Sequence, residues 1–166
     1  VPNGPAGDFA VGDLVLYNKD QVTRLLDRKG LIQRRAAGET MRPQLVAANV
    51  DTLGIVTSCN ADFNPARLER YAAMAAQADV LPLVILTKAD QVEDAATFRK
   101  QAEAISPLIT AITLNAKDPE DAIRLNPWCS NGETLALLGS SGVGKTTLQN
   151  VLTGVHEATQ GIREMD

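Results

Sequence analysis

Aromatic residues, cysteine and histidine are all scarce in this 166-residue sequence. Aromatic residues make up 4% of it, and there are two cysteines and a single histidine, His156. Cys59 and Cys129 stand far apart, with no nearby cysteine or histidine at a metal-binding spacing, so neither a disulfide framework nor a zinc site is expected. We interpret His156 as an ordinary surface side chain. A reducing compartment fits this composition, and we expect a cytoplasmic location.

Long apolar runs are also absent. The longest, Leu81–Leu86 and Leu135–Leu138, fall far short of the roughly 20 residues that cross a bilayer, so no membrane contact is expected. The sequence opens without a basic stretch followed by an apolar run, which gives no sign of a signal peptide, and the missing initiator methionine suggests a trimmed start. With 45% hydrophobic and 22% charged residues, we expect one full globular domain and one partial domain, as a monomer.

Charge is unevenly distributed. The net charge of −4 argues against an electrostatic nucleic-acid clamp built from the whole chain. Residues 19–42, however, carry a local charge of +4. The basic residues there are Lys19, Arg24, Arg28, Lys29, Arg34, Arg35 and Arg42, and the acidic ones are Asp20, Asp27 and Glu39. Two interpretations stay open: a solvated strand-and-loop face, or an edge that faces RNA.

Two patterns divide the chain. Residues 1–43 contain short β segments separated by turns, at 14–17, 21–26 and 31–35, which predict a partial all-β domain. It is too short for a complete barrel of the oligonucleotide-binding type, so either strands are missing upstream or it packs as a remnant on the next domain. Residues 44–166 alternate apolar strands with amphipathic helices. The expected strands are 53–58, 82–87, 110–114 and 134–138, and the expected helices follow Asn64-Pro65, run from Ala95 to Ile105, and follow Gly144. This alternation predicts an α/β domain with a mostly parallel sheet covered by helices on both faces.

The last strand leads into the pattern of a phosphate-binding loop. Its residues are Gly139, Ser140, Ser141, Gly142, Val143, Gly144, Lys145 and Thr146, followed by Thr147. The glycines let backbone N–H groups converge on phosphate oxygens at the start of a helix. We expect Lys145 to neutralise the β and γ phosphates, Thr146 to bind Mg²⁺, and Thr147 to contact the α phosphate. The loop alone does not choose the base, because it also resembles that of transporter-type ATPases.

A second motif follows the strand that ends at Thr87. Thr87, Lys88, Ala89 and Asp90 resemble the element with which GTPases recognise guanine. The carboxylate of Asp90 matches the N1–H and 2-amino donors of guanine, whereas adenine lacks both. Lys88 would lie along the base, and Thr87 would brace the loop. Taken alone, the motif could equally be an ordinary turn before a helix.

A third, weaker motif consists of Asn115, Ala116 and Lys117, where a backbone N–H could meet guanine O6, although an exposed polar turn is the plainer interpretation. The sequence from Asp51 to Gly54 fits a metal and γ-phosphate switch, but it precedes a strand instead of following one. We therefore expect Asp51 only to begin that strand. Asp90 precedes Lys145, which reverses the usual order of the two motifs and indicates a permuted domain.

These motifs, together with further stretches, resemble the circularly permuted GTPases that depend on the small ribosomal subunit. The further stretches are Gly12-Asp13, Arg28, Arg34-Arg35, Gly38, Ala48–Asp51, Cys59-Asn60 and Asp62–Tyr71. The resemblance implies an oligonucleotide-binding barrel, a permuted GTPase domain and a C-terminal zinc-binding helical domain. It also implies binding of rRNA and the 30S subunit, and GTP hydrolysis stimulated by that subunit during its late maturation.

Three departures from the family pattern bear on function. The barrel is incomplete, Gly54 replaces a bulky apolar residue, and the sequence stops at Asp166, where the first switch would begin. We therefore expect this chain to bind GDP at least as well as GTP and to hydrolyse GTP poorly. Two alternatives remain: a transporter-type ATPase, and an RNA-binding module that nucleotide only regulates.

Overall fold

The computed structural model describes residues 8–19, 21–35 and 43–155. In chain order the elements are β1 (Val15–Asn18), β2 (Gln21–Leu25), β3 (Ile32–Arg35), β4 (Pro43–Ala47), β5 (Thr52–Ser58), α1 (Pro65–Gln77), β6 (Leu81–Thr87), η2 (Ala89–Gln91), α2 (Ala95–Glu103), β7 (Thr110–Thr113), α3 (Pro119–Ala122), η3 (Ile123–Trp128), β8 (Leu135–Leu138) and α4 (Lys145–Thr153). Within these ranges, none of the helices combines the length and the apolar character needed to traverse a bilayer.

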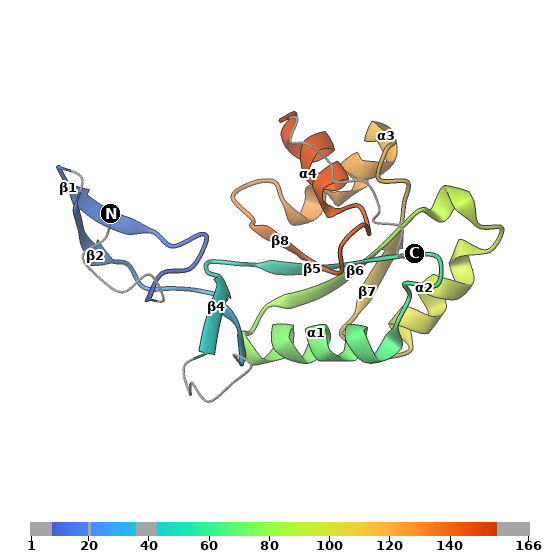
Figure 1. Ribbon diagram of the computed structural model, residues 1–166, viewed down its shortest axis with the longest axis horizontal. Coiled ribbons are helices and arrows are strands. Elements are labelled where there is room, and N and C mark those ends of the chain that lie inside the picture. Colours follow the sequence, from blue (N-terminus) through green and yellow to red (C-terminus); the bar gives the residue numbers. More distant parts are fainter. Residues whose placement is uncertain (1–7, 20, 36–42, 156–166) are drawn as a thin grey trace, which may run out of the picture.

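A four-stranded parallel sheet forms the centre of the molecule (Figure 1). Its strands lie in the order β7-β6-β5-β8, and all three pairings are parallel. All seven residues of β5 are buried, as are six of the seven in β6. Strands covered on both faces need apolar residues without alternation, which explains the continuous apolar runs in the sequence. The predicted parallel α/β sheet is confirmed.

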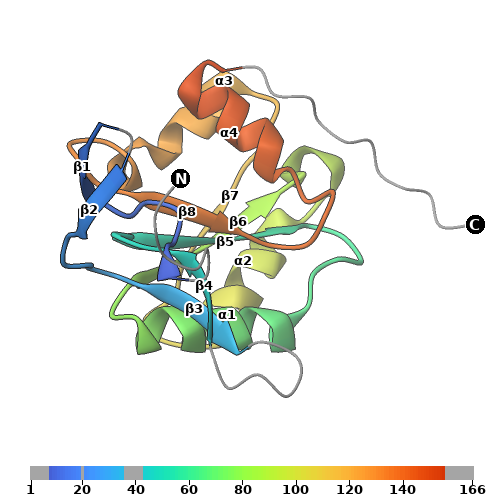
Figure 2. The ribbon, with the colours of Figure 1, turned by 60° about the vertical axis from the view of Figure 1, so that its left-hand side comes forward.

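Helices cover both faces of this sheet (Figures 1 and 2). Helices α1 and α2 pack on one face, where Leu68 and Ala102 join a core that includes Ile55. On the other face, α4 and the α3–η3 segment bury Leu148 and Leu125 in a second core. Neighbouring strand residues alternate between these two cores because successive side chains of a strand point to opposite faces.

Helix α1 begins as the sequence predicts. The Asn64 side chain accepts a hydrogen bond from the backbone N–H of Arg67 at 3.0 Å, and Pro65 occupies the first helical position. The helix ends at Gln77, slightly before the expected end near Asp79. Asp79 instead adopts a left-handed conformation with φ of 55°, which turns the chain sharply into β6.

Gly54 on β5 is surrounded by side chains from both neighbouring strands. A Cβ atom at this position would lie 2.8 Å from Cδ2 of Leu137, 3.0 Å from Cδ1 of Ile85 and 3.2 Å from Cδ1 of Leu135. These three side chains occupy the volume that a larger residue at position 54 would need. Side chains of β6 and β8 therefore fill the space beside Gly54.

The N-terminal part contains two antiparallel hairpins. Strand β1 pairs with β2, β3 pairs with β4, and a bridge between Val11 and Ala47 connects them. Three of these strands confirm the expected β segments, but β4 was not expected. It starts at residue 43, where we expected the domain division, and it pairs back onto β3. A division after Ala47 would keep the hairpin whole. The barrel and the division itself remain predictions, and Gly38, Arg42 and His156 lie outside the described residues.

Polar contacts join the N-terminal segments to one another and to the linker that precedes β5. The guanidinium of Arg28 donates to both carboxylate oxygens of Asp13 at 2.7 Å, and this pairing holds the pKa of Asp13 below its ordinary value. Asn49 donates to the carbonyl of Gly12 at 2.9 Å and accepts from the backbone N–H of Lys29 at 3.0 Å. Asn49, in the segment that leads into β5, therefore forms hydrogen bonds with both the stretch before β1 and the stretch after β2.

Asp51 joins the starts of β5 and β8. Its Oδ2 accepts a hydrogen bond from the backbone N–H of Thr134 at 2.8 Å, and its own N–H donates to the carbonyl of Thr134 at 3.0 Å. The residue thus begins a strand, as the sequence analysis expected, and lies at the opposite end of the sheet from the phosphate-binding motif.

Candidate nucleotide-binding site

The three predicted motifs meet at one edge of the sheet. They follow β6, β7 and β8, and parallel strands present their carboxyl ends at the same edge. The backbone N–H of Leu114 donates to the carbonyl of Leu86 at 2.9 Å, and the N–H of Ala89 donates to the carbonyl of Leu114 at 3.4 Å. These bonds hold the loop after β6 beside the loop after β7.

The loop after β8 has the backbone geometry of an anion site. A Cβ at Gly139 would lie 2.2 Å from the carbonyl oxygen of Val56, so only glycine fits where this loop crosses β5. Gly144 has φ of 99° and precedes α4, which starts at Lys145 without a side-chain cap. The amides of the first turn, at Lys145, Thr146 and Thr147, are therefore available to an anion.

Lys145 bends back over this loop. Its Nζ donates to the carbonyl oxygens of Gly139 at 2.9 Å and Ser140 at 2.5 Å. Burial lowers the pKa of the Lys145 ammonium from its ordinary value, and the nearby Asp62 carboxylate partly opposes that shift. A partly desolvated ammonium held at the phosphate loop by two backbone carbonyls is well suited to meet a phosphate.

Thr87 links the loop after β6 to the phosphate loop. The side chain is fully buried, and its Oγ1 lies 2.7 Å from the carbonyl oxygen of Val143 and 3.1 Å from that of Thr57. A hydroxyl carries one proton, so the shorter contact to Val143 is the better hydrogen bond. A Cβ at Gly144 would lie 3.6 Å from Cγ2 of Thr87. The two loops are thus in direct contact.

Asp90 lies just after β6, in the loop that Thr87 links to the phosphate loop. Lys88 adopts a left-handed conformation with φ of 57°, which turns the chain out of β6 and into the short helix η2 that carries Asp90. Asp90 is exposed, and its carboxylate has no hydrogen-bond partner among the residues that the structure describes. Both acceptor oxygens are therefore available to a ligand.

The third motif completes the wall beside the phosphate loop. Ala116 is 7% exposed, and its Cβ lies 3.5 Å from where a Cβ of Gly144 would be. The side chain of Asn115 accepts a hydrogen bond from the backbone N–H of Lys117 at 3.0 Å, which forms a tight turn. All three predicted motifs therefore lie together, and their roles toward a nucleotide remain predictions.

Asp62 is a neighbour of the phosphate loop to which the sequence analysis gave no role, although it begins one of the stretches that resemble the family. The hydroxyl oxygen of Ser140 lies 2.9 and 3.1 Å from the two carboxylate oxygens of Asp62 and donates its single proton to this carboxylate, and Arg67 forms an ion pair with Asp62 at 2.8 Å. Asp62 and Ser140 are 78 positions apart, and the pattern contains no signal for their pairing. Only the fold brings them together.

The candidate site offers one side chain that could act as a protein ligand for Mg²⁺. The hydroxyl of Thr146 has no hydrogen-bond partner among the described residues and stands in the first turn of α4. The described part of the chain has no cluster of three or more histidine, cysteine, aspartate or glutamate residues that could hold a metal ion. Mg²⁺ at nucleotide sites typically takes few protein ligands together with phosphates and water, so Thr146 alone is compatible with it.

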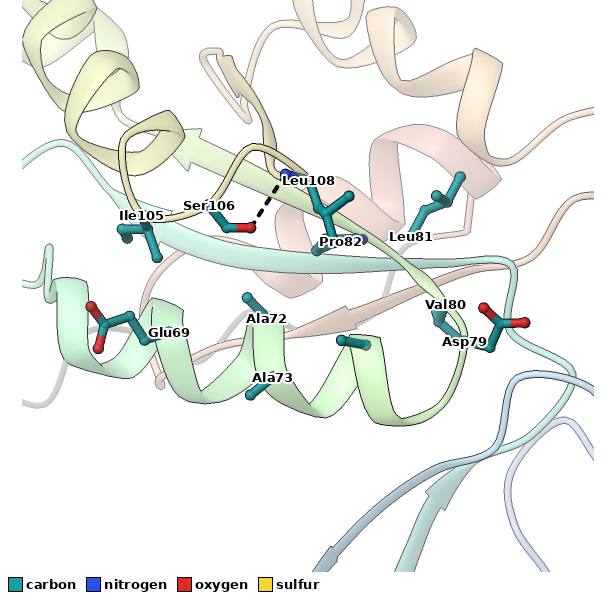
Figure 3. Close-up of a pocket in the computed structure, with 11 residues that line it drawn as sticks. Glu69, Ala72, Ala73, Asp79, Val80, Leu81, Pro82, Ile105, Ser106 and Leu108 are labelled. Carbon is teal, nitrogen blue, oxygen red and sulfur yellow. Dashed lines mark hydrogen bonds between the residues drawn. The ribbon is translucent and has the colours of Figure 1, made fainter.

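A separate hollow of about 480 Å³ lies at the other end of the sheet (Figure 3). Its wall combines α1 from Glu69 onward with the start of β6 and the segment after α2. The labelled lining residues are Glu69, Ala72, Ala73, Asp79, Val80, Leu81, Pro82, Ile105, Ser106 and Leu108. None of these belongs to the three motifs, so this hollow is distinct from the candidate site.

Comparisons with known proteins agree with this arrangement. The sequence profile of the RsgA GTPase family matches residues 25–166. The chain belongs to the RsgA GTPase family. It is 52% identical to the small ribosomal subunit biogenesis GTPase RsgA of Mesorhizobium japonicum, over 99% of this chain and 49% of that protein. It is 48% identical to the small ribosomal subunit biogenesis GTPase RsgA 2 of Vibrio parahaemolyticus, over 96% of this chain and 45% of that protein. The resemblance to this family is confirmed.

The chain spans about half the length of these curated relatives. Among solved structures, it is similar to YjeQ from Thermotoga maritima, with a TM-score of 0.67 and 23% identity. That match covers 92% of this chain and 54% of the YjeQ chain. It supports the mixed α/β fold of this RsgA GTPase family member.

Proposed function

We propose that this chain binds guanine nucleotides with Mg²⁺ and carries the nucleotide site of a GTPase. The observation that carries the proposal is the 2.7 Å contact between Thr87 Oγ1 and the carbonyl of Val143. It joins a base-reading motif to a phosphate-binding motif through a fully buried hydroxyl. In a transporter-type ATPase, the motif at Thr87–Asp90 would have no role beside the phosphate loop.

Each motif would bind one part of the nucleotide. Asp90 would accept hydrogen bonds from N1–H and the 2-amino group of guanine, and the stem of Lys88 would lie along the base. Ala89 would support this loop, while Asn115, Ala116 and Lys117 would form the wall at O6. The amides of Gly139 to Thr147, including those of Ser141 and Gly142, would bind the phosphates together with Lys145. Bound Mg²⁺ would neutralise charge on the β and γ phosphates, and the hydroxyl of Thr146 would hold it.

We further propose that the whole protein acts in the maturation of the small ribosomal subunit and hydrolyses GTP to GDP and phosphate. Support comes from the two curated relatives, which are named as small ribosomal subunit biogenesis GTPases. The partners would be the 30S subunit and its rRNA, met in the cytoplasm. The two N-terminal hairpins would belong to an oligonucleotide-binding barrel, and the base-reading motif precedes the phosphate loop because the domain is circularly permuted.

Titration calorimetry of the chain with GDP and ADP in Mg²⁺ tests the nucleotide proposal. We expect GDP to bind and ADP to bind far more weakly. Asp90→Asn should lower GDP affinity and raise affinity for xanthosine diphosphate, because xanthine has a carbonyl in place of the 2-amino group and an amide can donate to it. The variant Asp79→Asn, which changes an exposed aspartate at the opposite end of the sheet, is the matched control. Equal binding of GDP and ADP by the unmodified chain would contradict the proposal.

A further inference from the structure

We propose that Asp121 is a specificity-determining positioning residue. It holds the loop after β7 so that the backbone N–H of Ala116 is directed at the O6 atom of guanine. This inference rests on the proposed function, because it assumes that a guanine nucleotide occupies the site. Asp121 itself would not contact the nucleotide. It would act through the backbone of Asn115.

The carboxylate of Asp121 has two described partners. Its Oδ2 accepts a hydrogen bond from the backbone N–H of Asn115 at 2.6 Å, and its Oδ1 accepts one from Nη1 of Arg124 at 2.6 Å. The same nitrogen of Arg124 lies 3.1 Å from the carbonyl oxygen of Thr113, the last residue of β7. The strand end, the loop and α3 are therefore tied together at one carboxylate. Hydrogen bonds to an ionised carboxylate are shorter and stronger than neutral ones.

Three consecutive amides in this loop differ in their partners. The N–H of Asn115 is bound by Asp121, and the N–H of Lys117 is bound by the side chain of Asn115 at 3.0 Å. The N–H of Ala116, between them, has no partner among the described residues, although Ala116 is only 7% exposed. Buried backbone N–H groups almost always have a hydrogen-bond acceptor. A bound ligand would supply the acceptor that this amide lacks.

The position of Ala116 indicates which ligand atom that would be. It packs beside Gly144 at the start of α4, while Ala89 of the base-reading motif donates to the carbonyl of Leu114 just before it. The free amide thus lies between the base-reading loop and the phosphate loop. Guanine presents the carbonyl O6 on its six-membered ring, where adenine presents an amino donor. A fixed N–H donor would favour the carbonyl of guanine and repel the amino group of adenine.

Dissociation constants for three nucleotides separate this role from a general structural one. GDP has O6, N1–H and the 2-amino group. Inosine diphosphate keeps O6 and N1–H but lacks the 2-amino group. In 6-thioguanosine diphosphate a sulfur, which is a weak acceptor, replaces O6. We expect Asp121→Ala to lower the affinities for GDP and inosine diphosphate by a similar factor of about three- to tenfold. The affinity for 6-thioguanosine diphosphate should fall by less than about twofold.

Three further variants complete the design. Asp121→Asn keeps an oxygen acceptor for the amide of Asn115 and should restore GDP affinity to within about twofold of the unmodified chain. Arg124→Gln should weaken GDP binding less than Asp121→Ala does, and it too should affect the nucleotides that have O6 more than 6-thioguanosine diphosphate. Glu120→Ala removes a neighbouring carboxylate that has no described side-chain partner, and it should change nothing. Thermal unfolding of each variant verifies that the chain is folded.

Equal weakening of all three nucleotides by Asp121→Ala would overturn the inference, since it would indicate general loosening of the site. Failure of Asp121→Asn to recover affinity would overturn it as well. The proposed function has a separate criterion in the same experiment: the unmodified chain must prefer GDP over ADP. If that preference exists and Asp121→Ala leaves the GDP-to-6-thioguanosine ratio unchanged, only the role of Asp121 is wrong.

Discussion

Replacing Thr87 by valine tests whether the base-reading loop and the phosphate loop act as one unit. Valine has nearly the same shape as threonine but lacks the hydroxyl that donates to the carbonyl of Val143 at 2.7 Å. The methyl groups still fill the buried position beside Gly144. The change therefore removes one hydrogen bond and little packing, and any effect on nucleotide binding arises from the lost link.

The expected magnitudes follow from burial. Thr87 is fully buried, and a buried acceptor that loses its partner costs about 1–3 kcal/mol of stability. Nucleotide binding should also weaken, because the free energy needed to order the phosphate loop is then taken from binding. At a GDP concentration of about 100 times Kd, binding stabilises a folded protein by about 2.7 kcal/mol. A tenfold loss of affinity would reduce this stabilisation at the same concentration to about 1.4 kcal/mol.

Urea unfolding with and without GDP measures both quantities. Thr87→Ser keeps the hydroxyl and should retain most of the GDP-induced stabilisation. Thr110→Val, an exposed strand threonine with no described side-chain hydrogen bond, controls for the exchange of hydroxyl for methyl. If Thr87→Val lowers stability but leaves the GDP-induced increment unchanged, the hydroxyl is only a structural contact and the coupling argument is refuted.

Three other predictions concern stability and reactivity. The pairing with Arg28 holds the pKa of Asp13 below its ordinary value of 3.8, so the ionised carboxylate stabilises the fold above that pH. This contribution is lost as the pH falls through the lower pKa of the folded state. The Asp13→Asn variant should therefore be less stable than the unmodified chain near neutral pH, and the difference between their urea midpoints should shrink toward pH 3. Gly54→Ala should destabilise the chain by about 1–3 kcal/mol in the same assay, because its Cβ would meet the packed side chain of Leu137 at 2.8 Å. Burial raises the pKa of Cys59 to about 11, so a thiol reagent at pH 8 should label the half-buried Cys129 first and Cys59 only after unfolding; rapid labelling of Cys59 in the folded chain would contradict this.

The sheet and the places of the three motifs after its strands could be predicted because they depend on local patterns. Buried strands such as β5 and β6 need unbroken apolar runs, and the chain shows them. Glycine is needed where backbone passes close to backbone, as at Gly139 beside Val56. Once strands and helices alternate, parallel pairing places the loops that follow the strands at one edge. The clustering of the motifs is then a consequence of topology.

The contacts that position these motifs could not be predicted. The hydroxyl of Ser140 pairs with Asp62 across 78 positions, and neither residue type has a preferred partner that spacing could reveal. Strand β4 carries a proline and two polar or small residues among its five, so its pairing with β3 depends on the hairpin around it. Asp121 looks like an ordinary helix-start carboxylate until the fold brings it to Asn115.

The proposed permutation has a physical rationale in how the sheet is held at its two ends. At the nucleotide edge, buried side-chain contacts such as Thr87 to Val143 join loops that are 56 positions apart, and they do not depend on which loop comes first in the chain. At the other edge, the bonds between Asp51 and Thr134 fasten β5 directly to β8, which are neighbours in the sheet although strands β6 and β7 and helices α1, α2 and α3 lie between them along the chain. A chain that starts its α/β part at the central strand β5 can therefore build the same site as one that starts at β8, because the site is defined by contacts across the sheet and only weakly by chain order. We infer that the binding of nucleotide depends on the contacts between loops at the nucleotide edge more than on the connections between strands, so substitutions at Thr87 should affect it more than changes of length in the exposed turn at Gly132.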